Sequence, residues 1–216
     1  MNNRYKKVLL SLSLLMIVFW CILGTGASLA WFVDTDEEIK NVFHFAEFDL
    51  EVSHRLEDGT WETVEQSTKI FDDEALYEPG YVQTVFLRID NKGNVPFDFK
   101  TAVMVSDYTV ATNFFGQEFL LQDYLKFGLV TANTEYELEQ KVADRDLAVN
   151  IATMPLNNYY RDGYTTEPAE LGAKSSVYLA LIVRMPKDVE NVANFRGDVI
   201  PRVELGVIVS ATQKNN

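Results

Sequence analysis

The sequence is poor in the residues that most often carry catalysis or metal binding. Its 216 residues include one cysteine, Cys21, and two histidines, His44 and His54. A single cysteine excludes a disulfide framework and a multi-cysteine metal site, and two histidines fall short of the three or four ligands of a zinc site. No phosphate-binding glycine loop, Gly-x-Ser-x-Gly elbow or His-Glu-x-x-His motif is present. We therefore predict a protein that is not an enzyme, in which both histidines are structural or face solvent.

Positive charge is also scarce. Lys and Arg total 19 against 32 Asp and Glu, for a formal net charge of −13. Nucleic acids and anionic membranes are bound through clustered positive charge, so this balance argues against both as partners. The remaining composition, 47% hydrophobic and 24% charged, is that of an ordinary globular domain. The length suits one all-β domain, or at most two small ones.

Residues 1–30 have the pattern of a signal peptide. Three basic residues precede an uncharged run over 8–23, which at 16 residues is shorter than the ~20 that a membrane-spanning helix needs. Small residues follow, with Ser28 and Ala30 at the −3 and −1 positions of a signal peptidase site. We predict cleavage between Ala30 and Trp31. The alternative is an uncleaved anchor, because residues 29–33 lengthen the apolar run.

Cleavage would change the composition of the protein. The leader holds three basic and no acidic residues, so the mature 186 residues have 16 basic against 32 acidic residues and a net charge of −16. Cys21 would be lost with the leader. Contact with a membrane would be limited to the uncleaved leader. We divide the mature chain into an N-terminal donor or edge strand segment, 31–46, and a β-sandwich domain, 47–216.

Alternation of apolar and polar residues predicts strands over most of the mature chain. The clearest predicted strands are 48–53, 85–89, 97–105, 177–183 and 203–209. Turn signals separate them, at 57–60, at Pro79-Gly80 and at 91–94.

The middle of the chain has a different pattern. Apolar residues at helical spacing predict a short helix within 117–127, and helix-forming residues favour a second over 134–147. Residues 154–168 contain two prolines and Gly163 and are expected to form a long exposed loop. Strands at both ends with helical and loop insertions between them predict an all-β antiparallel sandwich.

Three acidic runs, 34–38, 72–74 and 144–146, are the only candidates for a metal site. None has the spacing of a dedicated Ca²⁺ loop, so solvated surface charge is the favoured interpretation. We predict no cofactor, with a weak structural Ca²⁺ site as the open alternative.

Four blocks of the sequence resemble the TasA/camelysin family. Residues 27–36 are similar to the leader junction cut by a SipW-type signal peptidase, where an aromatic pair and Asp-Thr follow the cleaved alanine. Residues 45–52 are similar to the next strand of that family. The later blocks are Leu76 to Gly80 with Phe86 to Asn94, and Phe195 to Gly197 with Val207 to Gln213. Residues 106–175 are weakly covered.

The resemblance implies a jelly-roll-like sandwich, secreted by Gram-positive bacteria to the cell surface or extracellular matrix, that forms biofilm fibres. It also implies donor-strand exchange, in which the freed N-terminal segment of one subunit joins the sheet of the next. The expected donor residues are apolar: Trp31, Phe32, Val33, Ile39, Val42, Phe43 and Phe45. The implied partners are further copies of the chain in a head-to-tail homopolymer, the SipW-type signal peptidase, and an accessory matrix protein.

Three alternatives stay open. Residues 31–45 can pair within their own subunit as an edge strand, as terminal strands often do. The chain can instead be a monomeric or accessory surface-binding module that uses Tyr159, Tyr160 and Tyr164 as an aromatic platform. A camelysin-type metalloprotease has the least support. In a fibre, a charge of −16 per subunit opposes stacking, so assembly would require salt, divalent cations, acid pH or a partner.

Overall fold

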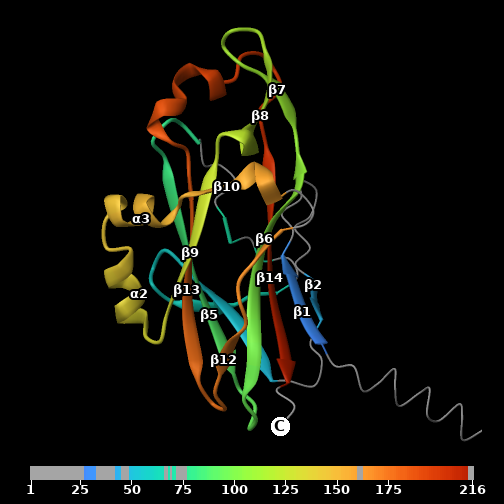
Figure 1. Ribbon diagram of the computed structural model, residues 1–216, viewed down its shortest axis with the longest axis vertical. Helices are drawn as coiled ribbons and strands as arrows, with labels where there is room; N and C mark the ends of the chain where they lie inside the picture. Colours follow the sequence, from blue (N-terminus) through green and yellow to red (C-terminus); the bar gives the residue numbers. More distant parts are fainter. Residues whose placement is uncertain are drawn as a thin grey trace, which may run out of the picture.

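The computed structural model describes residues 27–32, 42–44, 49–65, 68, 70–71, 77–159 and 163–213. Their fold is an antiparallel β-sandwich with short helical insertions, which confirms the predicted all-β class. The chain forms two large sheets and a two-stranded hairpin (Figure 1). Within the described part of the chain, no helix has the length and apolar character needed to cross a membrane.

Sheet A contains the two ends of the described chain. Its strands are β1 (Ala27–Phe32), β2 (Val42–His44), β6 (Phe97–Tyr108), β11 (Tyr164–Thr165), β12 (Ala169–Leu171) and β14 (Val203–Gln213). They lie in the order β11-β6-β14-β1-β2, with β12 also paired to β6. The central pair is long, because β14 follows β6 from Val203 opposite Tyr108 to Gln213 opposite Phe97.

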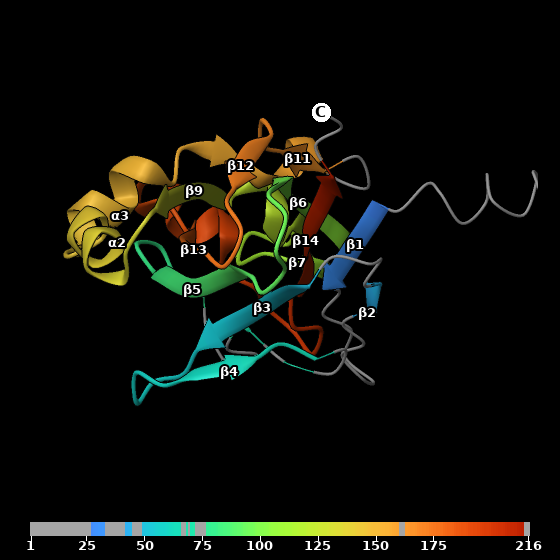
Figure 2. The ribbon, with the colours of Figure 1, turned by 90° about the horizontal axis from the view of Figure 1, so that it is seen from below.

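Sheet B is formed by strands from the middle of the chain. They are β3 (Leu50–Arg55), β4 (Trp61–Thr63), β5 (Val82–Asn91), β9 (Lys126–Ala132), β10 (Met154–Pro155) and β13 (Ser176–Arg184), in the order β10-β9-β13-β5-β3-β4. The hairpin is β7 (Val110–Thr112) with β8 (Glu118–Leu120). Figure 2 shows sheets A and B face to face, with the helices on the far side of sheet B.

The core lies between the sheets because alternate side chains of each strand point inward. On β5 these are Val85, Leu87 and Ile89, and on β13 Leu179 and Leu181, all buried. From sheet A the buried core residues are Phe97, Phe99, Val103 and Val105 of β6, and Leu205, Val207, Val209 and Ala211 of β14. These are the alternating positions that the sequence pattern predicts.

Sheet B also has a second, smaller core on its outer face. Helices α2 (Glu135–Lys141) and α3 (Arg145–Ile151) lie over β9, β13 and β5 (Figure 2). Leu138 and Ala148 of the helices pack there against Ala180 and Ile182, which alternate with the inward-facing residues of β13. Burial on both faces explains why β13 is apolar at nearly every position.

Three predictions for the middle of the chain need correction. Residues 117–127 do not form an α-helix: they contain β8, the three-residue 3-10 helix η1 (Leu121–Asp123) and the start of β9. The next residue, Gly128, is in β9, and a Cβ there would lie 2.3 Å from the carbonyl oxygen of Ile151 at the end of α3. The close approach of α3 to β9 therefore requires glycine at this position.

The predicted helix over 134–147 is instead two helices. Val142 leaves the helical conformation, and Asp144 starts α3 by accepting a hydrogen bond from the Leu147 amide at 2.8 Å. Thr134 caps α2 in the same way, through the Glu137 amide at 3.2 Å. The acidic run 144–146 therefore includes a helix cap rather than surface charge alone.

The described residues of the predicted exposed loop over 154–168 are largely in regular secondary structure. They contain β10, the 3-10 helix η2 (Leu156–Tyr159) and β11, and Leu156 is fully buried. Tyr159 and Tyr164 make edge-to-face contacts with buried Phe127, at 5.4 Å and 5.7 Å between ring centroids. These two rings therefore extend the core.

Candidate functional site

The predicted cleavage site lies inside a β-strand. β1 runs antiparallel to β14, from Ala27 opposite Thr212 to Phe32 opposite Val207. On its other side β1 pairs with β2 over residues 29–31. The bond between Ala30 and Trp31 therefore lies in a strand that has a neighbour on each side.

The structure brings part of the predicted donor segment to the edge of sheet A. In the uncleaved chain, β1 and β2 are the last two strands of that sheet. Trp31 lies opposite Val42, and Ala30 lies opposite Phe43. The donor residues therefore divide as follows: Trp31, Phe32, Val42 and Phe43 lie in β1 and β2, whereas Val33, Ile39 and Phe45 are outside the described residues.

The register identifies what cleavage after Ala30 would uncover. Residues 27–30 pair with Val209, Ser210, Ala211 and Thr212, and they are four of the six residues of β1. Without them, the end of β14 would keep β6 on one side and have an open edge on the other. An open edge presents unpaired N–H and C=O groups that bind a further strand.

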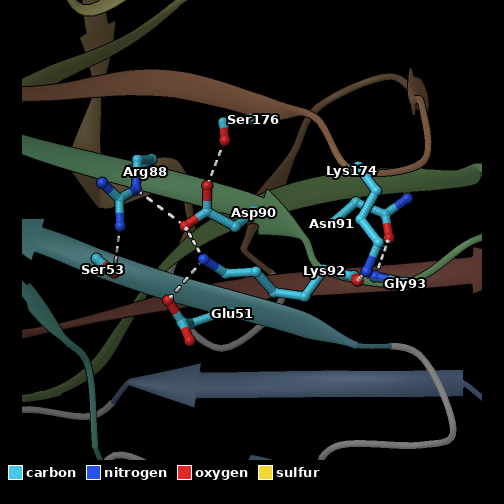
Figure 3. Close-up of polar contacts among 9 residues, drawn as sticks. All are labelled: Glu51, Ser53, Arg88, Asp90, Asn91, Lys92, Gly93, Lys174 and Ser176. Atoms are coloured by element: carbon cyan, nitrogen blue, oxygen red, sulfur yellow. Dashed lines mark hydrogen bonds and ion pairs between the residues drawn. The ribbon is translucent and has the colours of Figure 1, made fainter.

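A buried polar cluster lies on the outer face of sheet B. Asp90 is only 4% exposed, and its carboxylate accepts hydrogen bonds from Arg88 Nε at 2.9 Å and from the Ser176 hydroxyl (Figure 3). Lys92 Nζ lies 3.5 Å from the same carboxylate and 3.4 Å from Glu51. Glu51 is in β3, Arg88 and Asp90 are in β5, and Ser176 is in β13, while Lys92 directly follows β5. The cluster therefore links three adjacent strands. Its charges are paired within the fold, which favours a structural role.

Asn91, the last residue of β5, connects the two sheets. Its side-chain amide donates to the carbonyl oxygens of Val95, Leu171 and Gly172, at 2.9, 3.2 and 3.0 Å. Its Oδ1 accepts from the Gly93 amide at 3.0 Å (Figure 3). Sequence analysis predicts the turn but not this contact, because the partners at Leu171 and Gly172 are 80 and 81 residues away.

The histidines do not converge on a site. His44 lies in β2, and His54 is a buried residue of β3, 6% exposed. His54 Nε2 lies 3.4 Å from Glu62 Oε2 on the neighbouring strand β4. Among the described residues, no group of three His, Cys, Asp or Glu side chains is arranged to hold a metal ion. The acidic runs 34–38 and 72–74 are outside the described residues.

The proposed aromatic platform is also not a free surface. Tyr159 and Tyr164 are half-buried and lie 5.6 Å apart between ring centroids, edge to face. Together with Phe127 they form a three-ring cluster. Tyr160 is outside the described residues. The edge at β14 and β1 is therefore the strongest candidate site on the geometry.

The sequence was also compared with known proteins. No protein-family model matches the chain, and no curated protein matches it.

Proposed function

We propose that the chain is a secreted structural protein that assembles into extracellular or biofilm-matrix fibres by donor-strand exchange. In this mechanism, cleavage between Ala30 and Trp31 frees residues 31–45, which then add as a strand to the sheet of the next copy. The proposal rests on the resemblance to the TasA/camelysin family and on the position of the predicted cleavage site.

The supporting observation is the pairing of β1. The same cleavage that frees a new N-terminus at Trp31 would remove the strand partner of residues 209–212. A single event would therefore create both a donor segment and an acceptor edge. Because donor and acceptor lie at different places on each copy, the contact is head to tail, and it gives an open filament where the rotation between copies does not close a ring.

Strand exchange between copies must compete with pairing inside one subunit. In the uncleaved chain, β1 pairs with the edge of β14 in its own subunit. After cleavage, only Trp31 and Phe32 would remain of that strand. A two-residue strand makes few ladder hydrogen bonds, so a longer strand from another copy would displace it.

The experiment uses the full chain expressed in a secreting bacterial host, recovered as released and viewed by negative-stain electron microscopy over a range of salt and pH. A variant with Ile39→Glu and Phe43→Glu places charge in the donor segment. The control, Tyr136→Glu, changes a residue of α2 that is 70% exposed. We expect filaments from the native chain and the control, and none from the donor variant.

Two further results bear on the proposal. A synthetic peptide of residues 31–45 should stop filament growth by occupying the acceptor edge. Equal filaments from the donor variant and the native chain would contradict strand donation. A chain that stays monomeric in every condition, although correctly cleaved, would move the assignment to an accessory surface-binding module.

A further inference from the structure

Six exposed apolar side chains gather at one end of the molecule. Of the ten large hydrophobic residues exposed in the described chain, four are scattered and six form what we call the apical patch: Val110, Phe114, Phe115, Phe195, Val199 and Ile200. Their exposed fractions run from 39% for Phe195 to 60% for Phe115. The patch lies at the β7–β8 end of the long axis in Figure 1, away from the C-terminal end of β14. Exposed apolar side chains that gather in this way mark an interaction site.

The patch is preformed by its backbone. It comes from two segments, the β7–β8 hairpin and residues 195–200, and the second of these follows the 3-10 segment η3 (Lys187–Ala193). The Phe114 amide donates to the Asn194 carbonyl at 2.8 Å, and the Arg196 amide donates to the Thr112 carbonyl at 2.7 Å. The two segments are therefore held side by side.

One buried side chain fixes the turn that carries the two phenylalanines. Asn113 is 2% exposed, and its Oδ1 accepts from the amides of Phe115 and Gln117, both at 3.0 Å. Its Nδ2 donates to the Val192 carbonyl at 3.1 Å, which ties the turn to η3. The rings of Phe114 and Phe115 meet edge to face at 5.7 Å. A fixed pair of exposed aromatic rings loses little conformational entropy on binding, as in the anchors of protein interfaces.

We propose that the apical patch is a self-association surface, through which two copies of the chain meet end to end across a two-fold axis. The charges beside the patch support a second copy as the occupant. Arg196 and Asp198 flank Gly197, both are exposed, and neither forms an ion pair with any part of the chain that the structure describes. A two-fold contact allows Arg196 of each copy to face Asp198 of the other, so the surface is complementary to itself.

The charge of the whole chain also favours this occupant. A net charge of −13 disfavours an anionic membrane or a nucleic acid at the patch. Two such bodies repel each other least when they touch only at the ends of their long axes, because most of their charges are then separated by more than the Debye length of ~8–10 Å. The contact is distinct from the β14 edge and goes beyond the proposed fibre mechanism, since it joins copies two by two.

The first test is sedimentation equilibrium of the full chain as released from a secreting host, carrying the donor changes Ile39→Glu and Phe43→Glu so that no filaments form. A variant with Phe114→Ser and Phe115→Ser should weaken dimerisation about tenfold or more, the loss expected for removing central aromatic anchors. Tyr136→Ser, at an exposed aromatic residue outside the patch, should leave it unchanged. Circular dichroism and the thermal midpoint check that each variant folds.

Charge reversal tests the two-fold axis itself. Arg196→Asp and Asp198→Arg should each weaken the homodimer, whereas an equimolar mixture of the two variants should form a heterodimer, because opposite charges then face each other at both contacts. The double variant should dimerise like the native chain. No rescue in the mixture would overturn the two-fold arrangement.

Two further outcomes would show that a second copy of the chain does not bind the apical patch. A chain that is monomeric at every concentration overturns the proposal. So does binding to neutral phosphatidylcholine vesicles that is lost with Phe114→Ser and Phe115→Ser, since a lipid surface is then the occupant. The donor variant Ile39→Glu with Phe43→Glu should lose filaments but keep the dimer, so the failure of one proposal is distinguishable from the failure of the other.

Discussion

Sheet B and the outer edge of sheet A differ in how much of their structure depends on residues before the predicted cleavage site. Every strand of sheet B comes from residues 50–184, and α2 and α3 cover much of its outer face. The outer edge of sheet A is β1 and β2, and four residues of β1 precede that site. Sheet B is thus complete within the mature chain, whereas sheet A is complete only with a strand that processing would divide.

Because of this difference, the residues that keep the domain folded are largely not the residues that would exchange strands between copies. The largest set of buried side chains lies between the sheets, and most of its described members are on strands other than β1 and β14. The sandwich can therefore stay folded while the edge at β14 changes its partner. A protein that exchanges strands between copies needs this division, because an acceptor edge must open without unfolding the domain.

The largest effect on stability is expected in the centre of sheet B. Leu179 is fully buried on β13, between β5 and β9, and Leu179→Ala should lower the free energy of unfolding by about 2–5 kcal/mol through lost burial and a residual cavity. Urea denaturation measures this. Leu147→Ala on α3, at a side chain that is 39% exposed, is the control and should cost much less. Equal losses would show that sheet B is not the stable unit.

The second prediction concerns hydrogen exchange in the cleaved, monomeric chain. Amides of residues 209–212 that point toward the former position of β1 should exchange at least about 100-fold faster than those of β13, because edge openings need far less free energy than global unfolding. Residues of β13 have a neighbouring strand on both sides and serve as the internal control. Assembly into filaments should restore the protection. Strong protection at 209–212 in the monomer would mean that the edge has another partner.

A smaller effect is expected from the polar cluster on sheet B. Asp90→Ala removes the carboxylate that binds Arg88 and Ser176, and should cost about 1.5–3 kcal/mol, the usual range for hydrogen bonds to a charged group. The control is Glu51→Ala, since its side chain is 36% exposed and pairs only loosely with Lys92. That change should cost at most about 1 kcal/mol. If both variants lose the same free energy of unfolding, the burial of Asp90 is not the reason that the cluster stabilises the fold.

Sequence patterns predict one class of strand well. Strands β5, β6 and β14 alternate between a buried and a more exposed face, and their residues show it. The turn at Pro79-Gly80 was also predicted, and Gly80 has the positive φ of 97° that a type II turn requires, with the Tyr81 amide donating to the Glu78 carbonyl. These features are determined by neighbours along the chain.

Long-range contacts explain where sequence reasoning failed. Residues 117–127 have apolar residues at helical spacing, but they form β8, η1 and the start of β9, because Phe119, Leu121 and Phe127 pack into a core built by distant segments. The apical patch was missed for a related reason. Its two halves, around residues 114 and 195, are brought together by hydrogen bonds across about 80 positions of sequence. The pair Phe114-Phe115 beside Asn113 and Gly116 was the one local signal of an exposed aromatic turn.

The smallest effect is expected in the turn between β3 and β4, at the outer edge of sheet B. Hydrogen bonds from the Thr60 hydroxyl and the Thr60 amide, at 2.6 Å and 2.9 Å, lower the pKa of Asp58 below its ordinary value of 3.8. A lowered pKa in the folded state stabilises the protein above pH 3.8, and this contribution is lost as the pH falls through the folded-state pKa. Asp58 is fully exposed, so the effect should be small.

Asp58→Ala should therefore shift the urea midpoint slightly downward at neutral pH and not at all in strong acid, where the carboxylate is protonated in both states. Thr60→Val is the matched variant, because it removes the hydroxyl and keeps the amide, and it should give part of the same shift. A shift that is equal at both pH values would mean that the turn depends on the shape of Asp58 rather than on its charge.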